Sequence, residues 1–439
     1  MNPPLAKIPK SSSNWLVISF VAIVAIATVW VPLNRNHYNG LYNNLTWDAE
    51  GYYAYLPATF VCGYEHFPRN TFVDGHPHLP DYPGTNKVYL KYTCGVAMLQ
   101  WPFWLMAHGI SNTFPQYFPT DGFHGLYPLS MAVGNGVYMA LAFWLLWLAF
   151  RGRVSSVAFV LAALVFWTGT NLLYYSAVRL GYSHPCSFFL LAVLIWLTPQ
   201  WLRESRWWQW GLLGVTLGMI TLIRPVNAVV ALYPLLYPMP NTTFKQRVFG
   251  FFQNEQALLA LVLFLIPFIP QLLYWHHISG HYILYSYRQE TFSNWNHPML
   301  ISVLFGTRTG LLVYAPVTVI ALWAWWRFRD AVPSRAMAGI FMLSWYGWAS
   351  WVCWWFGTSF GYRPAFEYYA FLLLPLALQI QQWLLHRSWA VRSLVALPLF
   401  LALVNIKMLR MYTGAWELPY CSWQEVGDLY YTAITHLFS

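Results

Sequence analysis

Apolar runs of about 20 residues recur along the chain, and short polar segments separate them. A helix of about 20 mostly apolar residues can cross the hydrocarbon core of a membrane. The alternating short strands of a membrane barrel are not evident in the sequence. The pattern therefore predicts an all-α polytopic membrane protein. We expect about 11 transmembrane helices, at residues 14–33, 126–150, 154–172, 183–201, 208–224, 226–240, 256–276, 309–326, 336–355, 366–385 and 391–410.

The first apolar run, from Asn14 to Leu33, has the features of a retained membrane span. It is long for the apolar core of a signal peptide, and no small-x-small cleavage site stands where one is needed. We therefore expect an uncleaved first helix, with the N-terminus inside the cell.

A long polar segment, 34–125, follows this span and is predicted to form a folded outer loop. Within it, Gly95–Ile110 is apolar but short and interrupted by proline, so we expect an interfacial or re-entrant helix there. The aromatic residues of 51–62 suit a second helix that lies on the membrane surface. With an outer C-terminal tail at 411–439, the chain forms a single integral membrane domain over residues 1–439.

The distribution of charge supports this topology. Basic residues concentrate in the loops that the predicted spans put inside, as the positive-inside rule requires. If Gly95–Ile110 crossed the membrane, every later loop would change sides and the rule would fail. Thirteen basic residues against three acids (Glu204, Glu255 and Asp330) on that side account for the whole net charge of +10. The basic residues are Lys7, Lys10, Arg151, Arg153, Arg203, Arg206, Lys245, Arg247, Arg327, Arg329, Arg335, Arg387 and Arg392.

Composition narrows the classes of function. Charged residues make up 9% of the chain, whereas a soluble protein carries roughly a quarter. The 27 Trp and 30 Tyr residues suit aromatic belts at the membrane surfaces. The basic residues form no single patch, which argues against nucleic-acid binding. Five cysteines are too few for a disulfide scaffold; Cys62 and Cys94, both in the outer loop, either pair or remain thiols.

Two carboxylates, Asp48 and Glu50, stand just outside the first span. Acidic side chains near a membrane cost free energy, so their presence indicates a use. On an extended segment, residues two positions apart point the same way. One of the two acids then serves as a general base, or both hold a divalent cation. The structural alternative is that Asp48 caps a helix that starts near Gly51.

Five arginines are predicted at outer helix ends or in outer loops. A guanidinium binds phosphate through two hydrogen bonds, so several of them around one cavity would suit a phosphorylated lipid headgroup. The alternative is that each extends to lipid phosphate at the membrane rim. Arg308 and Arg363 stand out because each lies in a turn flanked by glycine, where the backbone can approach a ligand closely. The other three are Arg179, Arg224 and Arg288.

The histidines give weaker signals. His184 stands at the outer start of a predicted span and is expected to line the cavity. Two further groups, His76 with His78 and His276 with His277 and His281, either bind a metal or are loop residues without a role. Motifs for nucleotide binding and the hydrolase nucleophile elbow are not found, so chemistry driven by ATP is not expected.

Four short segments, together with the overall plan, resemble the C-type glycosyltransferase superfamily of integral membrane enzymes. This superfamily includes protein O-mannosyltransferases and the aminoarabinose transferases of lipid A. The shared plan is an N-terminus inside, a long first outer loop with surface helices, and an acidic motif after the first span. In the mannosyltransferase pattern Asp and Glu are adjacent, whereas Ala49 separates them here. The segments are DAEGYYAYLP at 48–57, KYTCG at 91–95, LIRPVN at 222–227 and SFGYR at 359–363.

The resemblance implies an enzyme that transfers a sugar, with inversion, from a polyprenyl-phosphate donor to a lipid, glycan or protein acceptor. The reaction would take place on the outer, periplasmic face of a bacterial inner membrane. Asp48, with Glu50 second, would act as the base; apart from a divalent cation on these two acids, no cofactor is implied. The residues expected to bind the substrate and its phosphate are Lys91, Arg224, Arg288, Arg308, Arg363, His184, Tyr52 and Tyr53.

Two other classes of protein remain open. A lipid or solute transporter, or a flippase, typically has charges near the middle of the membrane and repeated halves, neither of which the sequence shows. A catalytically inactive membrane scaffold of the same fold would tolerate the loss of Asp48 and Glu50.

Overall fold

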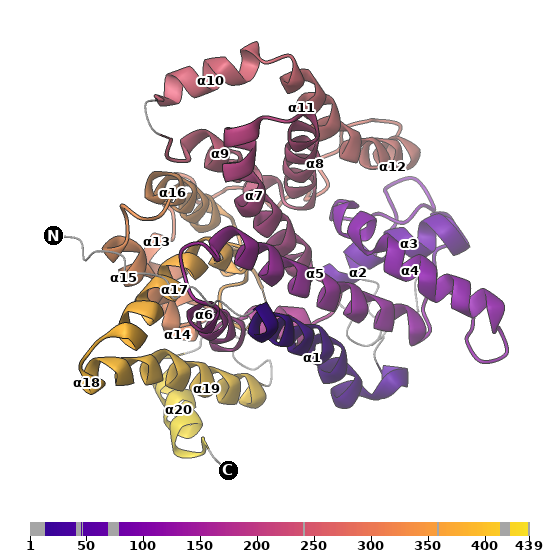
Figure 1. Ribbon diagram of the computed structural model, residues 1–439. Helices are drawn as coiled ribbons and strands as arrows, with labels where there is room; N and C mark the ends of the chain where they lie inside the picture. The colour runs from indigo at the N-terminus through magenta and orange to yellow at the C-terminus, as the bar shows by residue number, and fades with distance from the viewer. Residues whose placement is uncertain are drawn as a thin grey trace.

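The computed structural model describes residues 14–40, 45, 47–68, 79–239, 242–357, 360–412 and 422–437. Within these ranges the regular structure is helical, and one isolated antiparallel bridge joins Asp81 and Val88. Figure 1 shows the helices gathered around α5, α6, α7 and α17. The all-helical prediction is thus confirmed.

Five helical segments in the described ranges are long and apolar enough to cross a membrane. This agrees with a polytopic membrane protein, while the full count of 11 spans and their orientation stay predictions. The five are Asn14–Asn34 of α1 (Asn14–Gly40), α5 (Leu126–Phe150), α7 (His184–Glu204), the run Gln256–Ser279 formed by α11 (Gln256–Leu265), η5 (Ile266–Phe268) and α12 (Ile269–Ser279), and the run Trp389–Met411 formed by α18 (Trp389–Arg392), η7 (Ser393–Val395) and α19 (Ala396–Met411).

Shorter helices occupy the positions of the other predicted spans. Two of them differ from the expected bounds because of proline. Pro316 divides the predicted span 309–326, and α17, predicted from residue 366, begins at Tyr369, after a turn that contains Pro364. Proline lacks the N–H group that would bond to the preceding turn, so it favours a break at these two places. These helices are α6 (Ser156–Gly169), α8 (Trp207–Ile223), η4 (Pro225–Ala231) with α9 (Leu232–Leu236), α14 (Leu311–Tyr314) with α15 (Val317–Arg327), α16 (Ser334–Ser350) and α17 (Tyr369–Leu385).

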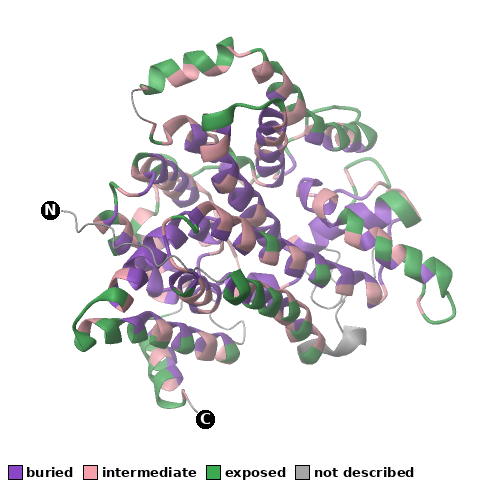
Figure 2. Cartoon of the chain, in the orientation of Figure 1, coloured by how far each residue is buried: buried purple, intermediate pink, exposed green. Residues whose placement is uncertain are grey.

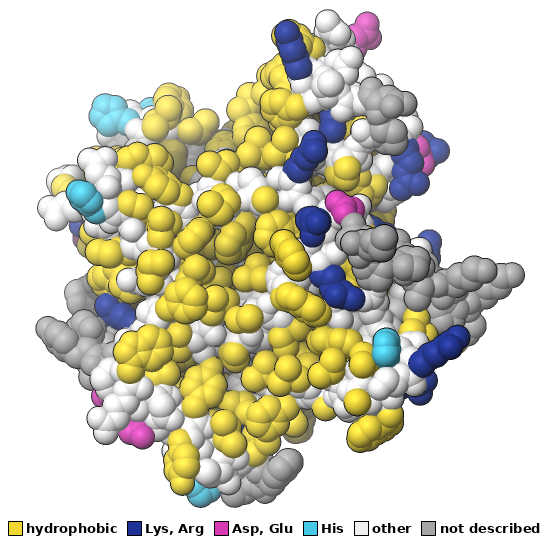
Figure 3. Space-filling view, turned by 90° about the vertical axis from the view of Figure 1, so that its left-hand side faces the viewer, with side chains coloured by type: hydrophobic (Ala, Val, Ile, Leu, Met, Phe, Trp, Pro, Cys, Tyr) yellow, Lys and Arg dark blue, Asp and Glu magenta, His cyan; other side chains and the backbone are white. Residues whose placement is uncertain are grey.

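The core is formed by α5, α6, α7 and α17, which are largely buried in Figure 2. Helix α1 packs against α5, and α8 packs against α11. The exposed side of α1 carries Trp15, Ile26 and Trp30, as expected of a helix that faces lipid. In the view of Figure 3, hydrophobic side chains cover most of the surface, and Lys and Arg side chains lie mainly toward one edge.

The predicted outer loop contains more helix than expected. Residues 48–62 form α2 (Asp48–Tyr53), α3 (Tyr55–Pro57) and a π-helical turn, η2 (Ala58–Cys62). The aromatic side chains of this segment are mostly buried against the protein, and Phe60 and Val61 are its exposed apolar residues. That it lies on the membrane surface stays a prediction. Helix α4 (Gly95–Thr113) contains the expected helix at 95–110 and packs on α5.

The remaining helices lie in the loops and the tail. The predicted C-terminal tail includes α20 (Trp423–Thr435), which packs against α19. The others are the π-helical turn η3 (Tyr174–Val178), α10 (Phe244–Gln253), α13 (Leu300–Phe305) and the short turn η6 (Arg363–Ala365).

Candidate functional site

Asp48 begins α2, and its carboxylate is held by residues far away in the sequence. Its Oδ2 lies 2.9 Å from Nη1 of Arg363, and its Oδ1 accepts a hydrogen bond of 2.6 Å from the Tyr92 hydroxyl. The helix-cap alternative is not supported, because Asp48 is the first helical residue, Trp47 holds the cap position, and the Asp48 carboxylate contacts Arg363 and Tyr92. The side chain is therefore committed to tertiary contacts.

These contacts decide the charge of Asp48. Burial alone would raise the pKa of its carboxyl, but Arg363, the Tyr92 hydroxyl and Lys91 together lower this pKa below its ordinary value. Asp48 in turn raises the pKa of Arg363 against the effect of burial. The pair is thus an anion and a cation at neutral pH.

Glu50 lies elsewhere, and the expectation that it points the same way as Asp48 is wrong. Both residues belong to a helix, in which side chains two positions apart point about 200° apart. Glu50 is 1% exposed, and its Oε2 has no hydrogen-bond partner among the described residues. Burial raises its pKa to about 8, so this carboxyl is protonated at neutral pH.

A second buried carboxylate, Glu367, joins three helix ends. Its Oε1 accepts from Nη1 of Arg224 at 3.2 Å and from Nδ2 of Asn227 at 2.7 Å. Its Oε2 lies 3.2 Å from Nδ1 of His184. His184 starts α7, Arg224 follows α8, and Asn227 belongs to η4. The carboxylate thereby gathers elements that are distant in sequence.

Sequence reasoning missed Glu367. It stands four residues after Arg363 and within the predicted span 366–385. An acid at the mouth of a membrane span is costly and marks a candidate site, so the signal was present in the sequence. Its partners His184 and Arg224 were expected, but the anion that brings them together was not.

Tyr52 connects the two carboxylate centres. Its ring stacks on Tyr92, with 4.7 Å between the ring centroids. Burial, and then the charge of Asp48, raise the pKa of Tyr52 to about 12, while Arg224 and Arg363 oppose this rise. The Tyr52 hydroxyl is thus within electrostatic reach of both arginines and of Asp48. The described residues that converge are Asp48, Tyr52, Tyr92, His184, Arg224, Arg363 and Glu367, and we call this set the polar cluster.

Lys91 lies at the rim of the polar cluster. Its Nζ is 2.5 Å from Oε1 of Glu290 and rests over the rings of Tyr92 and Tyr287, at 5.4 and 5.3 Å from their centroids. It is about one-third exposed, and its charge helps to lower the pKa of Asp48. This is the placement of a residue that could meet a ligand entering from outside.

Besides Glu50 and Lys91, three expected residues lie outside the polar cluster. The Tyr53 hydroxyl donates to the carbonyl of Gly122 and accepts from Trp104, because neighbouring positions on a helix face different ways. Arg288 is exposed, with its guanidinium 4.3 Å from the centroid of the Tyr89 ring. The Arg308 guanidinium lies 4.2 Å from the centroid of Trp355.

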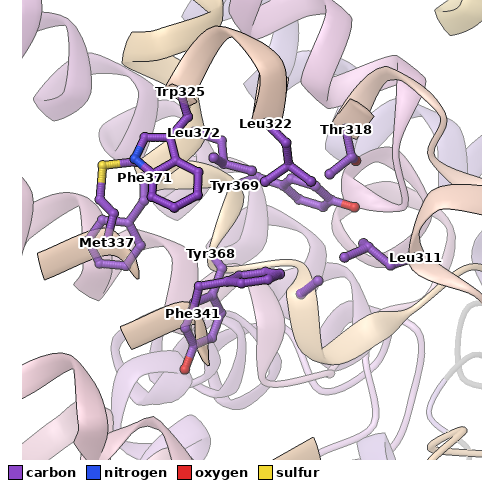
Figure 4. A pocket seen from close by; sticks show the side chains of 11 residues that line it. Leu311, Thr318, Leu322, Trp325, Met337, Phe341, Tyr368, Tyr369, Phe371 and Leu372 are labelled. Atoms are coloured by element: carbon purple, nitrogen blue, oxygen red, sulfur yellow. The ribbon is translucent and has the colours of Figure 1, made fainter. Parts of the chain in front are cut away.

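An apolar pocket adjoins the polar cluster. Figure 4 shows side chains from α15, α16 and α17 converging on it, and the cavity they leave is small, about 30 Å³. The ring of Tyr368 lines this pocket, while its hydroxyl donates to Oδ1 of Asn227 at 3.1 Å. Asn227 in turn contacts Glu367, so one tyrosine joins the pocket to the buried charges. The pocket is lined by Leu311, Thr318, Leu322, Trp325, Met337, Phe341, Ala365, Tyr368, Tyr369, Phe371 and Leu372.

The structure also bears on the metal sites and on the pairing of Cys62 with Cys94 that the sequence left open. No three His, Cys, Asp or Glu side chains in the described ranges are grouped as a metal site, and Asp48 and Glu50 do not converge. His277 pairs with Glu65 at 3.1 Å, whereas His76 and His78 lie outside the described residues.

Cys62 and Cys94 are not joined in a disulfide, and both are thiols. Sγ of Cys62 contacts the Pro57 carbonyl, and Sγ of Cys94 contacts Met98.

Comparisons with known proteins identify no relative. The chain matches no protein-family model, no curated protein and no solved structure. Its function must therefore be argued from the polar cluster and the adjoining pocket.

Proposed function

We propose that the protein is a membrane glycosyltransferase that takes a sugar from a polyprenyl-phosphate donor. The acceptor is a lipid, a glycan or a protein, and the reaction faces the periplasm of a bacterial inner membrane. The observation that carries the proposal is the convergence of two arginines, Arg224 and Arg363, in one polar cluster beside apolar helices. Such cations suit an anionic headgroup, and the hydrocarbon tail of the donor would stay in the surrounding lipid.

The arginines can hold the donor phosphate. Arg224 and Arg363 each contact a carboxylate through Nη1. A guanidinium carries five N–H donors, so further donors of each fork are available for phosphate oxygens. Negative charge develops on the phosphate as the sugar leaves, so fixed cations stabilise the transition state more than the ground state.

Asp48 is the proposed base. The acceptor hydroxyl oxygen forms a bond to the anomeric carbon from the face opposite the phosphate, and the bond from that carbon to the phosphate oxygen breaks. The electron pair of the broken bond goes to the phosphate, and the hydroxyl proton goes to Asp48. Because Arg363 and Tyr92 keep Asp48 anionic, this proton transfer takes place late, when the acceptor oxygen has become strongly acidic.

The test compares native membranes that contain wild-type protein, Asp48→Asn or Glu50→Gln. We expect Asp48→Asn to abolish one surface glycan and to accumulate its lipid-linked donor, both measured by mass spectrometry. Glu50→Gln is the matched control and should retain transfer, because Glu50 lies away from the polar cluster. Unchanged glycans in both variants, at equal protein level, would exclude the transferase.

Transport of a lipid or solute is the second candidate. The observation that favours it is the complete burial of Glu367 beside Arg224 and His184, since buried charges between helices often mark a transport path. In that case Glu367→Gln would abolish uptake or flipping in proteoliposomes, while Asp48→Asn would leave all glycans unchanged. A scaffold would lose neither transport in Glu367→Gln nor any glycan in Asp48→Asn.

A further inference from the structure

Helix α10 lies in the loop between α9 and α11, apart from the helical core (Figure 1). None of its residues is fully buried. A capping box fixes its start: Thr243 Oγ1 accepts from the backbone N–H of Gln246, and the Gln246 side chain accepts from the backbone N–H of Thr243. This exposed helix therefore has a defined beginning and a defined register.

One stripe of α10 faces the protein. Arg247 donates to the backbone carbonyl of Tyr237. The ring of Phe251 packs against Trp201 and Trp210, with centroid distances of 6.3 and 5.0 Å. Arg247 and Phe251 stand four positions apart, so they lie on the same side of the helix. These contacts fix the rotation of α10 about its own axis.

The other two sides of α10 differ in character. Phe244, Phe249 and Phe252 form an exposed apolar stripe, and Phe252 is 76% exposed. Gln246 and Gln253, seven positions apart, form an exposed polar stripe. At about 100° per residue, the centres of the three stripes stand roughly a third of a turn apart. The helix therefore presents one side each to protein, to an apolar medium and to water.

We propose that α10 lies in the lipid–water interface of the membrane and binds anionic lipid headgroups there. A helix with separate apolar and polar exposed sides fits an interface, where one side meets acyl chains and the other meets water. The adjoining helices α9 and α11 lead into predicted spans, which puts α10 at the membrane surface. Clustered exposed phenylalanines are unusual on a surface that faces only water.

The charge of α10 selects the lipid. Lys245 is exposed and lies on the same side of the helix as the three phenylalanines, with its Nζ 5.8 Å from the centroid of the Phe249 ring. A lysine at this position can bury its stem in the interface and place its ammonium among headgroups. Basic residues near a membrane attract anionic lipids, so the headgroup that α10 recognises is negatively charged.

Spin-label accessibility tests the placement. A nitroxide is attached to Phe252→Cys or to Gln246→Cys, in full-length protein whose native cysteines are replaced, and the protein is reconstituted in bilayers. We expect the label at 252 to collide preferentially with oxygen, which concentrates in lipid, and the label at 246 with a water-soluble nickel chelate. Preference for the chelate at both positions, or shielding from both reagents by another protein, would overturn the proposal.

A second measurement needs no cysteine substitution. The unfolding temperature of wild-type protein in nanodiscs should rise when phosphatidylglycerol replaces part of the phosphatidylcholine, and Lys245→Gln should lose at least half of this rise. Arg387→Gln, which removes an exposed basic residue from a different loop, is the matched control and should keep the rise. An equal rise in wild type and Lys245→Gln would show that α10 does not bind anionic lipid. Neither result depends on the transferase proposal.

Discussion

Asp48 and Glu50 belong to one short helix, yet their surroundings give the two carboxyls opposite charges at neutral pH. Arg363 and the Tyr92 hydroxyl keep Asp48 anionic. Glu50 is enclosed by the protein, and burial alone accounts for its raised pKa. Of these two carboxyls, only Asp48 is therefore available as a proton acceptor near neutral pH.

The raised pKa of Glu50 predicts how stability depends on pH. The unfolded chain loses the Glu50 proton near its ordinary pKa of 4.5, whereas the folded protein keeps it until about pH 8. The contribution of this group is thus fully present below pH 4.5 and is lost as the pH rises toward 8. Glu50→Gln removes the ionisable proton and should raise the free energy of unfolding at pH 7 by about 3 kcal/mol, because pH 7 lies well above the ordinary pKa and below the raised one.

Thermal unfolding in detergent at pH 5 and pH 7 measures this effect. The difference between the variant and the wild type should be larger at pH 7 than at pH 5. Glu255→Gln changes an exposed acid outside the core and serves as the control. A Glu50→Gln variant that is destabilised equally at both pH values would contradict the prediction.

Glu367 is predicted to stabilise the fold as well as the site. Glu367→Gln leaves Arg224, which is only 15% exposed, without its anion. Removing one member of a buried ion pair costs about 3–5 kcal/mol, and the slight exposure of Arg224 places this case near the lower end. The measurement is the unfolding temperature, with Asp330→Asn, an exposed acid, as the control. An unfolding temperature equal to that of the wild type would show that solvent already screens Arg224.

At the residue scale, the sequence predicts which types of side chain meet but not how they pair. Asp48, Tyr52, His184, Arg224 and Arg363 were expected in one region, and the structure brings them together. Two failures have a physical cause. The expected partnership of Asp48 with Glu50 assumed an extended backbone, and the central position of Glu367 depends on tertiary packing, which one sequence does not display.

At the scale of helices, glycine decides how closely α8 and α11 approach. Gly214 and Gly218 stand four positions apart on α8, and a Cβ at either one would overlap the backbone carbonyl of Ala260 or Phe264 on α11. Small residues at this spacing allow close helix contact inside membranes. The sequence contains the motif, but the partner helix became evident only in the folded arrangement.

Substitution at Gly218 tests this contact. Gly218→Ala should lower the free energy of unfolding by about 1–3 kcal/mol, because backbone atoms cannot move away as a flexible side chain can. Gly211→Ala is the matched control, since its Cβ would meet side-chain methyl groups of Leu263 and Leu259, at 3.0 and 3.9 Å, and no backbone atom. If both variants unfold at the same temperature, the α8–α11 contact is less rigid than described.

Proline explains the largest difference in helix bounds. Apolar length predicted one helix over 309–326, but Pro316 separates α14 from α15. Hydropathy measures how strongly a segment prefers lipid to water. The break in this helix depends instead on proline, which has no backbone N–H group and whose ring clashes with the preceding turn. Helix positions were therefore predicted well, and helix ends less well.

For the whole molecule, the excess of basic residues on one side predicts the topology. Alkaline phosphatase, which is active only outside the cytoplasm, should be active when fused after His297 and inactive when fused after Gln246 or Arg329. Fusions with a green fluorescent protein that folds only in the cytoplasm should give the opposite pattern. Reversed activities at these three sites would mean that α4 crosses the membrane fully.

Each arginine of the polar cluster already forms an ion pair with a carboxylate of the same chain, and these pairs would affect how a donor phosphate binds and leaves. In the proposed reaction a donor phosphate shares Arg363 with Asp48 and Arg224 with Glu367, so each carboxylate competes with it for the same guanidinium. The proposal therefore predicts a moderate affinity for phosphate, because part of each arginine's charge is already neutralised. Once Asp48 has released the proton that it accepts, its ion pair with Arg363 is restored and weakens the hold on the spent carrier. Such an arrangement would favour fast release over tight retention, which suits a catalyst that frees its carrier lipid for reuse.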